Sequence, residues 1–190
     1  MYRNTTSAYG SVAKVLHWLM ALWFVLACLI IVYLTWDHGT GPVPHLNYHK
    51  VVGFTLLLPL LLRVVWRWKN PAPALPAGMP RWQRLASRIS HRLLYALLLF
   101  MPVTGYLGNG GGVDYGLFQI PPFMQTALAA RLFDALGITA PQWDRFFDLL
   151  HYGITGPWLL PALLALHAGA ALYHHWVLKD DILQRMLPGR

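Results

Sequence analysis

The chain contains no glutamate, and all seven of its acidic side chains are aspartates. Charge of either sign is scarce, because only 12% of the 190 residues are Asp, Lys or Arg, whereas soluble domains carry about 25% charged residues. Hydrophobic residues make up 56% of the chain, and the mean hydropathy is +0.43. This composition excludes an ordinary soluble domain and predicts a protein that lies in a membrane.

Cysteine is almost as rare. The single Cys28 cannot form an internal disulfide. A cleavable signal sequence is not expected either, because the first apolar run is too long for a signal core and contains His17. We therefore expect this run to remain in the protein as a helix.

Four apolar runs are each long enough for a transmembrane helix, which needs about 20 residues. Helices are expected because lipid offers no partner to an unpaired backbone group. Four spans place both termini on one side, and nine Trp and nine Tyr can supply aromatic belts at the interfaces. The predicted fold class is an all-α integral membrane protein, a single domain over residues 1–190 with a four-transmembrane-helix bundle. The expected spans are about residues 12–36, 48–68, 88–108 and 149–178.

Basic residues are divided unevenly between the two sides of this bundle. Twelve Lys or Arg fall at the termini or near the connection between the second and third spans, and three fall on the other side. Because positive charge marks cytoplasmic loops, both termini are expected in the cytoplasm. Topology also explains the basic composition without any nucleic-acid binding. The twelve are Arg3, Lys14, Arg63, Arg67, Lys69, Arg81, Arg84, Arg88, Arg92, Lys179, Arg185 and Arg190, and the three are Lys50, Arg131 and Arg145.

The three connections differ in character. Residues 37–47 are expected to form a short outer loop, and the proline-rich residues 70–80 an extended inner loop. The outer segment 109–148 is long and contains QTALAARLFDAL, in which apolar residues recur at helical spacing. We predict a short helix at the outer interface there.

Four histidines lie inside these apolar runs, two near each face. An ionisable side chain within a membrane span is costly and is a functional hypothesis by default. A lone histidine can simply bond a carbonyl of a neighbouring helix, so the argument depends on the set. Pairs at two depths are what two bis-histidine haems require, with His17 and His167 near the inner face, and His49 and His151 near the outer face. The last helix would ligate both irons, at points about 24 Å apart along an ideal axis.

Haem suits these histidines better than zinc. A structural zinc ion needs four converging ligands, usually with cysteine, whereas these ligands divide by depth. Because there is no CxxCH motif, the two haems would be non-covalent. Small residues that would let a macrocycle pass close to the backbone include Gly53, Ala170 and Ala171, although such residues also serve helix packing. Two axial imidazoles favour electron transfer over oxygen binding.

Two further histidines are candidates for a quinone site. His174 follows His167 by seven residues, on the same face and close to the inner surface. It is either an interfacial anchor or a group that hydrogen-bonds a quinone carbonyl and passes a proton. His91 faces inward at the cytoplasmic start of the third span and is the next candidate, for ubiquinone or for a haem propionate.

Several strings resemble bacterial cytochrome b561. LHWLMAL around His17 resembles its first helix, and NYHKVVG at His49 with the later LLLRVVWRWKNPAP resembles its second. HRLLYALLLFMPVTGYL resembles the third helix, and LHAGAALYHHWVLKDDILQRMLP the C-terminal end. The resemblance covers nearly the whole chain except residues 109–148.

The resemblance implies a bacterial inner-membrane protein with two haem b groups. The family's four axial histidines match His17, His49, His151 and His167, and its quinone histidine matches His174. The short four-helix members look most like the di-haem enzyme that oxidises superoxide at the periplasmic face and reduces ubiquinone in the membrane. The resemblance thus implies a superoxide oxidase, that is, a superoxide:ubiquinone oxidoreductase.

One spacing departs from the family pattern. The two ligands of the last helix are usually about 14 residues apart, which leaves them about 40° from a common face of an α-helix. Here the separation is 16 residues, or about 160° on an ideal helix. Glycines and prolines lie between the two histidines, and we predict that a kink or π-type winding returns His151 to the haem face.

The expected function is electron transfer from periplasmic superoxide to ubiquinone. Lys50, beside His49, is the candidate for steering the superoxide anion, and membrane snorkelling is an equal alternative for it. The rival hypothesis is a cytochrome b subunit of a larger hydrogenase or dehydrogenase, fed by a partner redox protein that docks on residues 109–148. A third class is a haem-free transport or scaffold protein.

Overall fold

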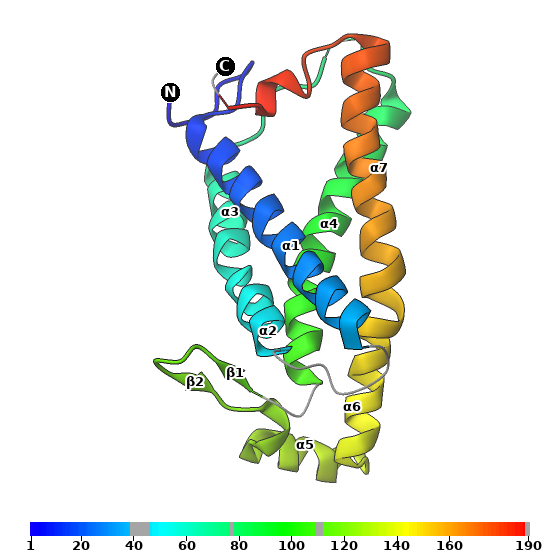
Figure 1. Ribbon diagram of the computed structural model, residues 1–190. Coiled ribbons are helices and arrows are strands. Elements are labelled where there is room, and N and C mark those ends of the chain that lie inside the picture. Colours follow the sequence, from blue (N-terminus) through cyan, green and yellow to red (C-terminus); the bar gives the residue numbers. More distant parts are fainter. Residues whose placement is uncertain (39–45, 77, 109–111, 189–190) are drawn as a thin grey trace.

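The computed structural model describes residues 1–38, 46–76, 78–108 and 112–188. The fold is mostly helical, with long helices that run side by side between two ends (Figure 1). Both termini lie at one of these ends, here called the terminal end. The opposite end, which carries a small β-hairpin, is here called the hairpin end.

The first two predicted spans agree closely with the structure. Helix α1 covers Ser11–His38. The second span consists of α2 (Leu46–Thr55) and α3 (Leu57–Lys69), which are separated by a turn at Leu56. Pro59 accounts for this break, because proline has no N–H to donate to the carbonyl four residues earlier.

The third helix begins earlier than predicted. Helix α4 covers Arg81–Leu107 and starts directly after Pro80, whereas apolar patterning placed the start at about residue 88. Its first two turns are basic, and hydropathy detects only the apolar part of such a helix. The sequence therefore predicted the apolar part of α4 but not its basic beginning.

The last helix is continuous over Ala140–Leu178 but changes its winding three times. It begins as α6 (Ala140–Asp148), becomes a π-helix over Leu149–Leu159, continues as α7 (Leu160–Tyr173) and ends as a second π-turn over His174–Leu178. The predicted irregularity between the two histidines is thus confirmed as π-type winding.

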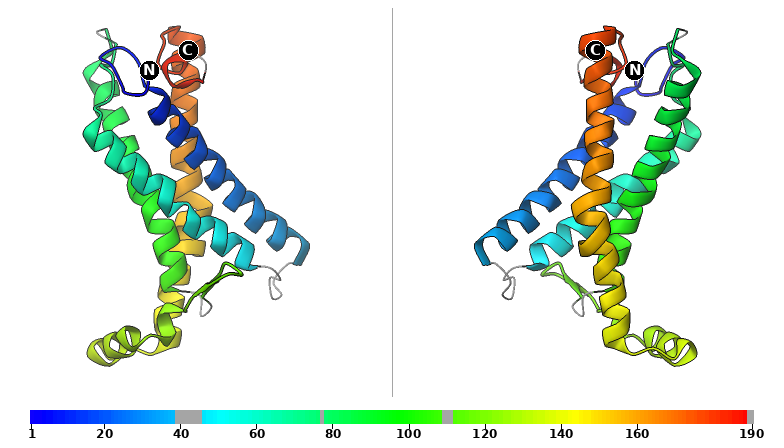
Figure 2. Two further views of the ribbon diagram at one scale, coloured as in Figure 1. Left: turned by 90° about the vertical axis from the view of Figure 1, so that its left-hand side faces the viewer. Right: turned by 90° about the vertical axis from the view of Figure 1, so that its right-hand side faces the viewer.

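The segment before this helix forms the hairpin end. Strands β1 (Val113–Asp114) and β2 (Gln119–Ile120) pair antiparallel, and a 3₁₀ turn follows at Phe123–Gln125. The predicted short helix is confirmed as α5 (Ala127–Leu136), which extends sideways from the bundle (Figure 2). The hairpin and α6 were not predicted. The predicted loop at residues 37–47 lies largely outside the described residues.

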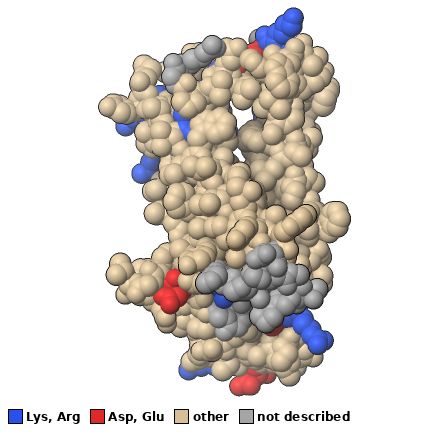
Figure 3. Space-filling view, viewed as in Figure 1, with Lys and Arg blue, Asp and Glu red and all other residues tan. Residues whose placement is uncertain are grey.

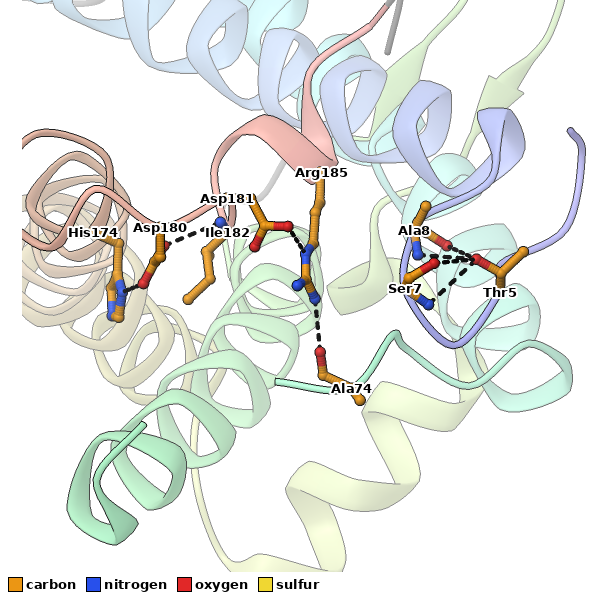
Figure 4. A network of polar contacts seen from close by, with 9 residues as sticks. All are labelled: Thr5, Ser7, Ala8, Ala74, His174, Asp180, Asp181, Ile182 and Arg185. Atoms are coloured by element: carbon orange, nitrogen blue, oxygen red, sulfur yellow. Dashed lines mark hydrogen bonds and ion pairs between the residues drawn. The ribbon is translucent and has the colours of Figure 1, made fainter. Parts of the chain in front are cut away.

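The terminal end is closed by segments from both ends of the chain. The Nζ of Lys14 donates to the carbonyl of Leu187 at 2.9 Å, and the indole of Trp18 to the carbonyl of Met186 at 2.9 Å. Gln184–Met186 form a short 3₁₀ turn. Arg185 bonds the carbonyl of Ala74 in the proline-rich loop, so this tail holds that loop as well (Figure 4).

The surface of the bundle is apolar between its two ends. Figure 3 shows the visible charged side chains toward the ends and an uncharged band between them. Within the apolar helices, Leu22, Leu61 and Leu166 are each more than half exposed, as lipid-facing side chains would be. Among the described residues, three helical stretches are long and apolar enough to cross a membrane: Ser11–Trp36, Leu46–Lys69 and Ala140–Leu178.

Candidate functional site

The structure brings His49 of α2 against His151 of the π-helix, here called the hairpin pair. Their ring centroids are 6.2 Å apart, with an angle of 82° between the ring planes. His49 Nδ1 donates to the carbonyl of Ala27 at 2.9 Å, and His151 Nδ1 to the carbonyl of Met101 at 2.9 Å. A carbonyl can only accept, so each ring keeps Nε2 as the nitrogen with a free lone pair.

His17 of α1 and His167 of α7 form the terminal pair. Their ring centroids are also 6.2 Å apart, with an interplanar angle of 81°. His17 Nδ1 is buried and has no hydrogen-bond partner within the described part of the chain. The ring of His91 lies 5.2 Å from that of His167, and its Nδ1 donates to the Ser87 carbonyl at 2.7 Å.

Both pairs fit a metal held between two opposed imidazoles. An imidazole nitrogen binds a transition metal at about 2 Å, and the ring centroid lies roughly 1 Å behind it, so two rings on one iron have centroids about 6 Å apart. Metal-ligating histidines also donate their other N–H to a carbonyl, as both members of the hairpin pair do. Across the described ranges, no three His, Cys, Asp or Glu side chains converge as a closed zinc site would require.

An apolar layer separates the two pairs. It is formed by six buried residues from every long helix of the bundle: Met20, Leu56, Leu60, Leu94, Leu98 and Leu160. Leu60 and Leu160 are 1% exposed. The two histidine pairs therefore occupy separate depths, with an apolar core between them.

The π-helix accounts for the placement of His151. A π-helix turns by roughly 80° per residue, against about 100° for an α-helix. Half of the 16 steps from His151 to His167 lie in each kind of winding, so the total rotation comes within about 20° of whole turns. Both histidines then lie on one face, which an α-helix of that length would not achieve.

Glycines make room beside these rings. A Cβ at Gly105 of α4 would lie 2.9 Å from His151 Cε1, so this close approach requires glycine. The sequence interpretation did not identify Gly105. A Cβ at Gly53 would meet nothing within 4 Å, so the predicted small residue after His49 does border open space. Figure 3 also shows a hollow between α1 and α7, in the half nearer the terminal end.

His174 lies at the terminal end, where the last π-turn begins. Its Nδ1 donates to Asp180 Oδ2 at 2.5 Å, and Asp180 Oδ1 accepts from the Ile182 backbone N–H at 3.1 Å (Figure 4). The chain reverses at Lys179, whose φ of 55° is left-handed, and this turn returns Asp180 to the histidine. The sequence interpretation found His174 but missed its carboxylate partner.

Lys50 follows His49 in α2 and is partly buried. The hairpin is fixed close by, because the Asn47 side chain donates to the Asp114 carbonyl at 2.7 Å and accepts from the Asp114 N–H at 3.0 Å. Arg131 and Arg145 are exposed on α5 and α6.

A buried arginine is a further candidate for the functional site. Arg63 of α3 is 9% exposed, and it donates from Nη1 to the Ala13 carbonyl at 2.9 Å and from Nε to the Tyr95 hydroxyl at 3.0 Å. The sequence interpretation counted Arg63 only as an inner-side charge. An arginine within the apolar string LLLRVVW was the signal that could have identified it.

Known proteins resemble this chain over three quarters or more of its length. "Cytochrome b561 homolog 2" of Escherichia coli (strain K12) is 34% identical over 195 residues, covering 98% of this chain and 94% of that protein. "Probable superoxide oxidase CybB" of Yersinia pestis is 27% identical over 186 residues, covering 91% and 92%. "Cytochrome b561 homolog 1" of E. coli is 24% identical over 145 residues, covering 75% and 74%.

The family model for prokaryotic cytochrome b561 matches residues 8–189. That family consists of membrane electron-transfer proteins that bind haem b. Since this match and the 34% identity both extend along almost the entire sequence, the chain belongs to the prokaryotic cytochrome b561 family.

Proposed function

We propose that this protein is a di-haem membrane cytochrome that passes electrons from periplasmic superoxide to ubiquinone. The observation that carries the proposal is that the terminal pair and the hairpin pair lie at different depths, each with ring centroids 6.2 Å apart. His17 and His167 would hold the inner haem b, and His49 and His151 the outer one. Bound haem supplies a one-electron carrier that a polypeptide lacks.

The protein's own contribution is to fix and shield these groups. The carbonyls of Ala27 and Met101 orient the hairpin pair by accepting from Nδ1. Thr104 is 1% exposed, and its hydroxyl oxygen lies 3.2 Å from His151 Nδ1, where it accepts from the same N–H that donates to Met101. The apolar layer between the pairs offers no polar side chain that would hold water at the bundle centre.

We further propose four membrane spans, with the terminal end in the cytoplasm of a bacterial inner membrane. Helix α4 would be the third of these spans along the chain, since it has 27 residues and packs beside α2, α3 and α7. Twelve basic residues near the terminal end, against three elsewhere, support this orientation.

Superoxide is the proposed donor, and the relative named as a probable superoxide oxidase supports this choice. Lys50 adjoins the hairpin pair and would raise the local potential for an anion. Ubiquinone is the proposed acceptor, with His174 as its hydrogen-bonding partner. Two superoxide anions, one ubiquinone and two protons would give two molecules of dioxygen and one ubiquinol.

A second candidate function is favoured by the hairpin tip. Leu117 is 97% exposed and Phe118 59% exposed there. An apolar tip at this end would suit a partner redox protein, which would make the chain the cytochrome b subunit of a larger hydrogenase or dehydrogenase.

Purified protein tests both candidates. Pyridine haemochrome analysis should give two non-covalent haems per chain, and a superoxide-generating system should reduce ubiquinone with this chain alone. One haem or none would contradict the di-haem proposal. Two haems without superoxide-dependent reduction would favour the partner-fed subunit.

A further inference from the structure

The guanidinium of Arg63 is a cation enclosed in the half of the bundle that holds the terminal pair. Its side chain is nine-tenths buried, and its helix lies within an apolar span. Even after the surrounding protein relaxes, moving an ion out of water costs several kcal/mol of free energy unless an opposite charge compensates it. The position of Arg63 therefore requires an explanation.

The contacts that the structure gives Arg63 are neutral. They are the Ala13 carbonyl of α1 and the Tyr95 hydroxyl of α4. Within the described residues, the salt bridges involve Asp180 and Asp181, and neither carboxylate reaches Arg63. Two neutral hydrogen bonds join three helices, but a neutral amide could make similar bonds without burying a charge.

The location of Arg63 indicates which anion could compensate its charge. Ala13 precedes His17 by one turn of α1, so the guanidinium lies within one helical turn of that histidine. An anion that bound here would thus belong to a group held between His17 and His167.

We propose that Arg63 binds a propionate carboxylate of the haem held by the terminal pair. The inference rests on the proposed function, because it requires a haem between His17 and His167. A haem carries two propionates, and a guanidinium binds a carboxylate through two parallel hydrogen bonds. Nε and Nη1 already have partners from the protein, and the remaining N–H groups are available for the carboxylate. Tyr95 and Ala13 hold the guanidinium in place for this contact.

Reconstitution with protohaem, compared with reconstitution with its dimethyl ester, tests the proposal. Apoprotein with His49→Ala retains only the terminal pair, and it would be titrated with protohaem or with protohaem dimethyl ester, in which both carboxylates are esterified. With Arg63 present, the ester should bind at least about tenfold more weakly, because hydrogen bonds to a charged group are lost. Arg63→Gln should bind protohaem and its dimethyl ester with nearly equal affinity. Arg63→Lys should recover part of the difference in affinity between the two compounds.

Arg67→Gln is the matched control, since Arg67 lies one turn further along α3 and is exposed. It should preserve the full preference for protohaem. Equal affinity for protohaem and its dimethyl ester with Arg63 in place would overturn the inference while leaving the bis-histidine site intact. Failure of protohaem itself to bind would instead overturn the proposed haem site, and the inference with it.

Discussion

The histidines of this chain differ in what their Nδ1 atoms contact. In the hairpin pair, Nδ1 donates to backbone carbonyls, which fix the tautomer without adding charge. In His174 it donates to the carboxylate of Asp180, a partner suited to a ring that hands on a proton. The same residue type thus has a partner that suits the proposed metal ligation at one position and a partner that suits the proposed proton transfer at another.

Removing either member of a pair should remove the same haem. His49→Ala and His151→Ala should each lose the outer haem, because each leaves one iron with a single axial ligand. His17→Ala and His167→Ala should each lose the inner haem. Reduced-minus-oxidised spectra and haem per chain would measure this. Retention of two low-spin haems by His151→Ala would transfer the ligand role elsewhere, first to His45, which lies outside the described residues.

Asp180 should affect the quinone reaction through His174. We expect His174→Ala to keep both haem spectra and to slow haem reoxidation by ubiquinone at least about tenfold, or about 1.4 kcal/mol. Asp180→Asn should slow it in the same direction but less, because the amide oxygen can still accept from Nδ1. Stopped-flow absorbance would measure both rates.

The neighbouring Asp181 provides the control for Asp180. It is 54% exposed and pairs with Arg185 instead of a histidine. Asp181→Asn should leave reoxidation unchanged. If His174→Ala reoxidised at the wild-type rate, the quinone site would have to be sought at His91.

At the scale of the element, the π-helix decides where His151 lies. Gly156 lies in this winding, and a Cβ there would be 2.7 Å from the carbonyl oxygen of His151. Backbone cannot move aside as a flexible side chain can. Gly156 is therefore a residue on which the π-type winding depends.

Gly156→Ala should destabilise this winding by about 1–3 kcal/mol and weaken the outer haem selectively. Gly169→Ala is the control, because a Cβ at Gly169 would meet nothing within 4 Å. Haem per chain and the thermal midpoint would be compared for both variants. A Gly156→Ala protein with a full outer haem would show that the winding tolerates a side chain there.

The sequence predicted these elements to different degrees. The long helices and α5 followed from hydropathy and helical spacing, and the π-type winding followed from two histidines at an unsuitable separation. The hairpin was missed because its two-residue strands are too short to give a pattern. Gly105, Tyr95 and Asp180 were missed for another reason: each contributes through a contact to another helix or across a turn, which periodicity along one helix does not reveal.

At the scale of the whole molecule, positive charge is concentrated toward the terminal end of the bundle. Arg63 lies inside the terminal half, and most other basic residues surround the terminal end. The hairpin end carries three Lys or Arg with five Asp, namely Asp37, Asp114, Asp134, Asp144 and Asp148. Attraction of an anion at the hairpin end must therefore be local.

Lys50→Gln should lower the second-order rate of haem reduction by superoxide and weaken its dependence on salt. The reason is that the Debye length falls from about 30 Å at 0.01 M to about 10 Å at 0.1 M, which screens a steering charge. Stopped-flow measurement at several ionic strengths would test this, with a neutral artificial donor as the control. An unchanged rate and salt slope would remove Lys50 from the donor site.

The continuous helix from Ala140 to Leu178 carries one proposed ligand of each haem and also His174. Inserting one residue into an α-helix rotates everything beyond it by about 100°, which would separate ligands that must share a face. A π-turn absorbs an added residue by winding more loosely. The register between the two proposed ligands, His151 and His167, therefore depends on winding as much as on residue count. A designer could lengthen this helix between His151 and His167, provided that glycine or proline permitted a compensating π-turn.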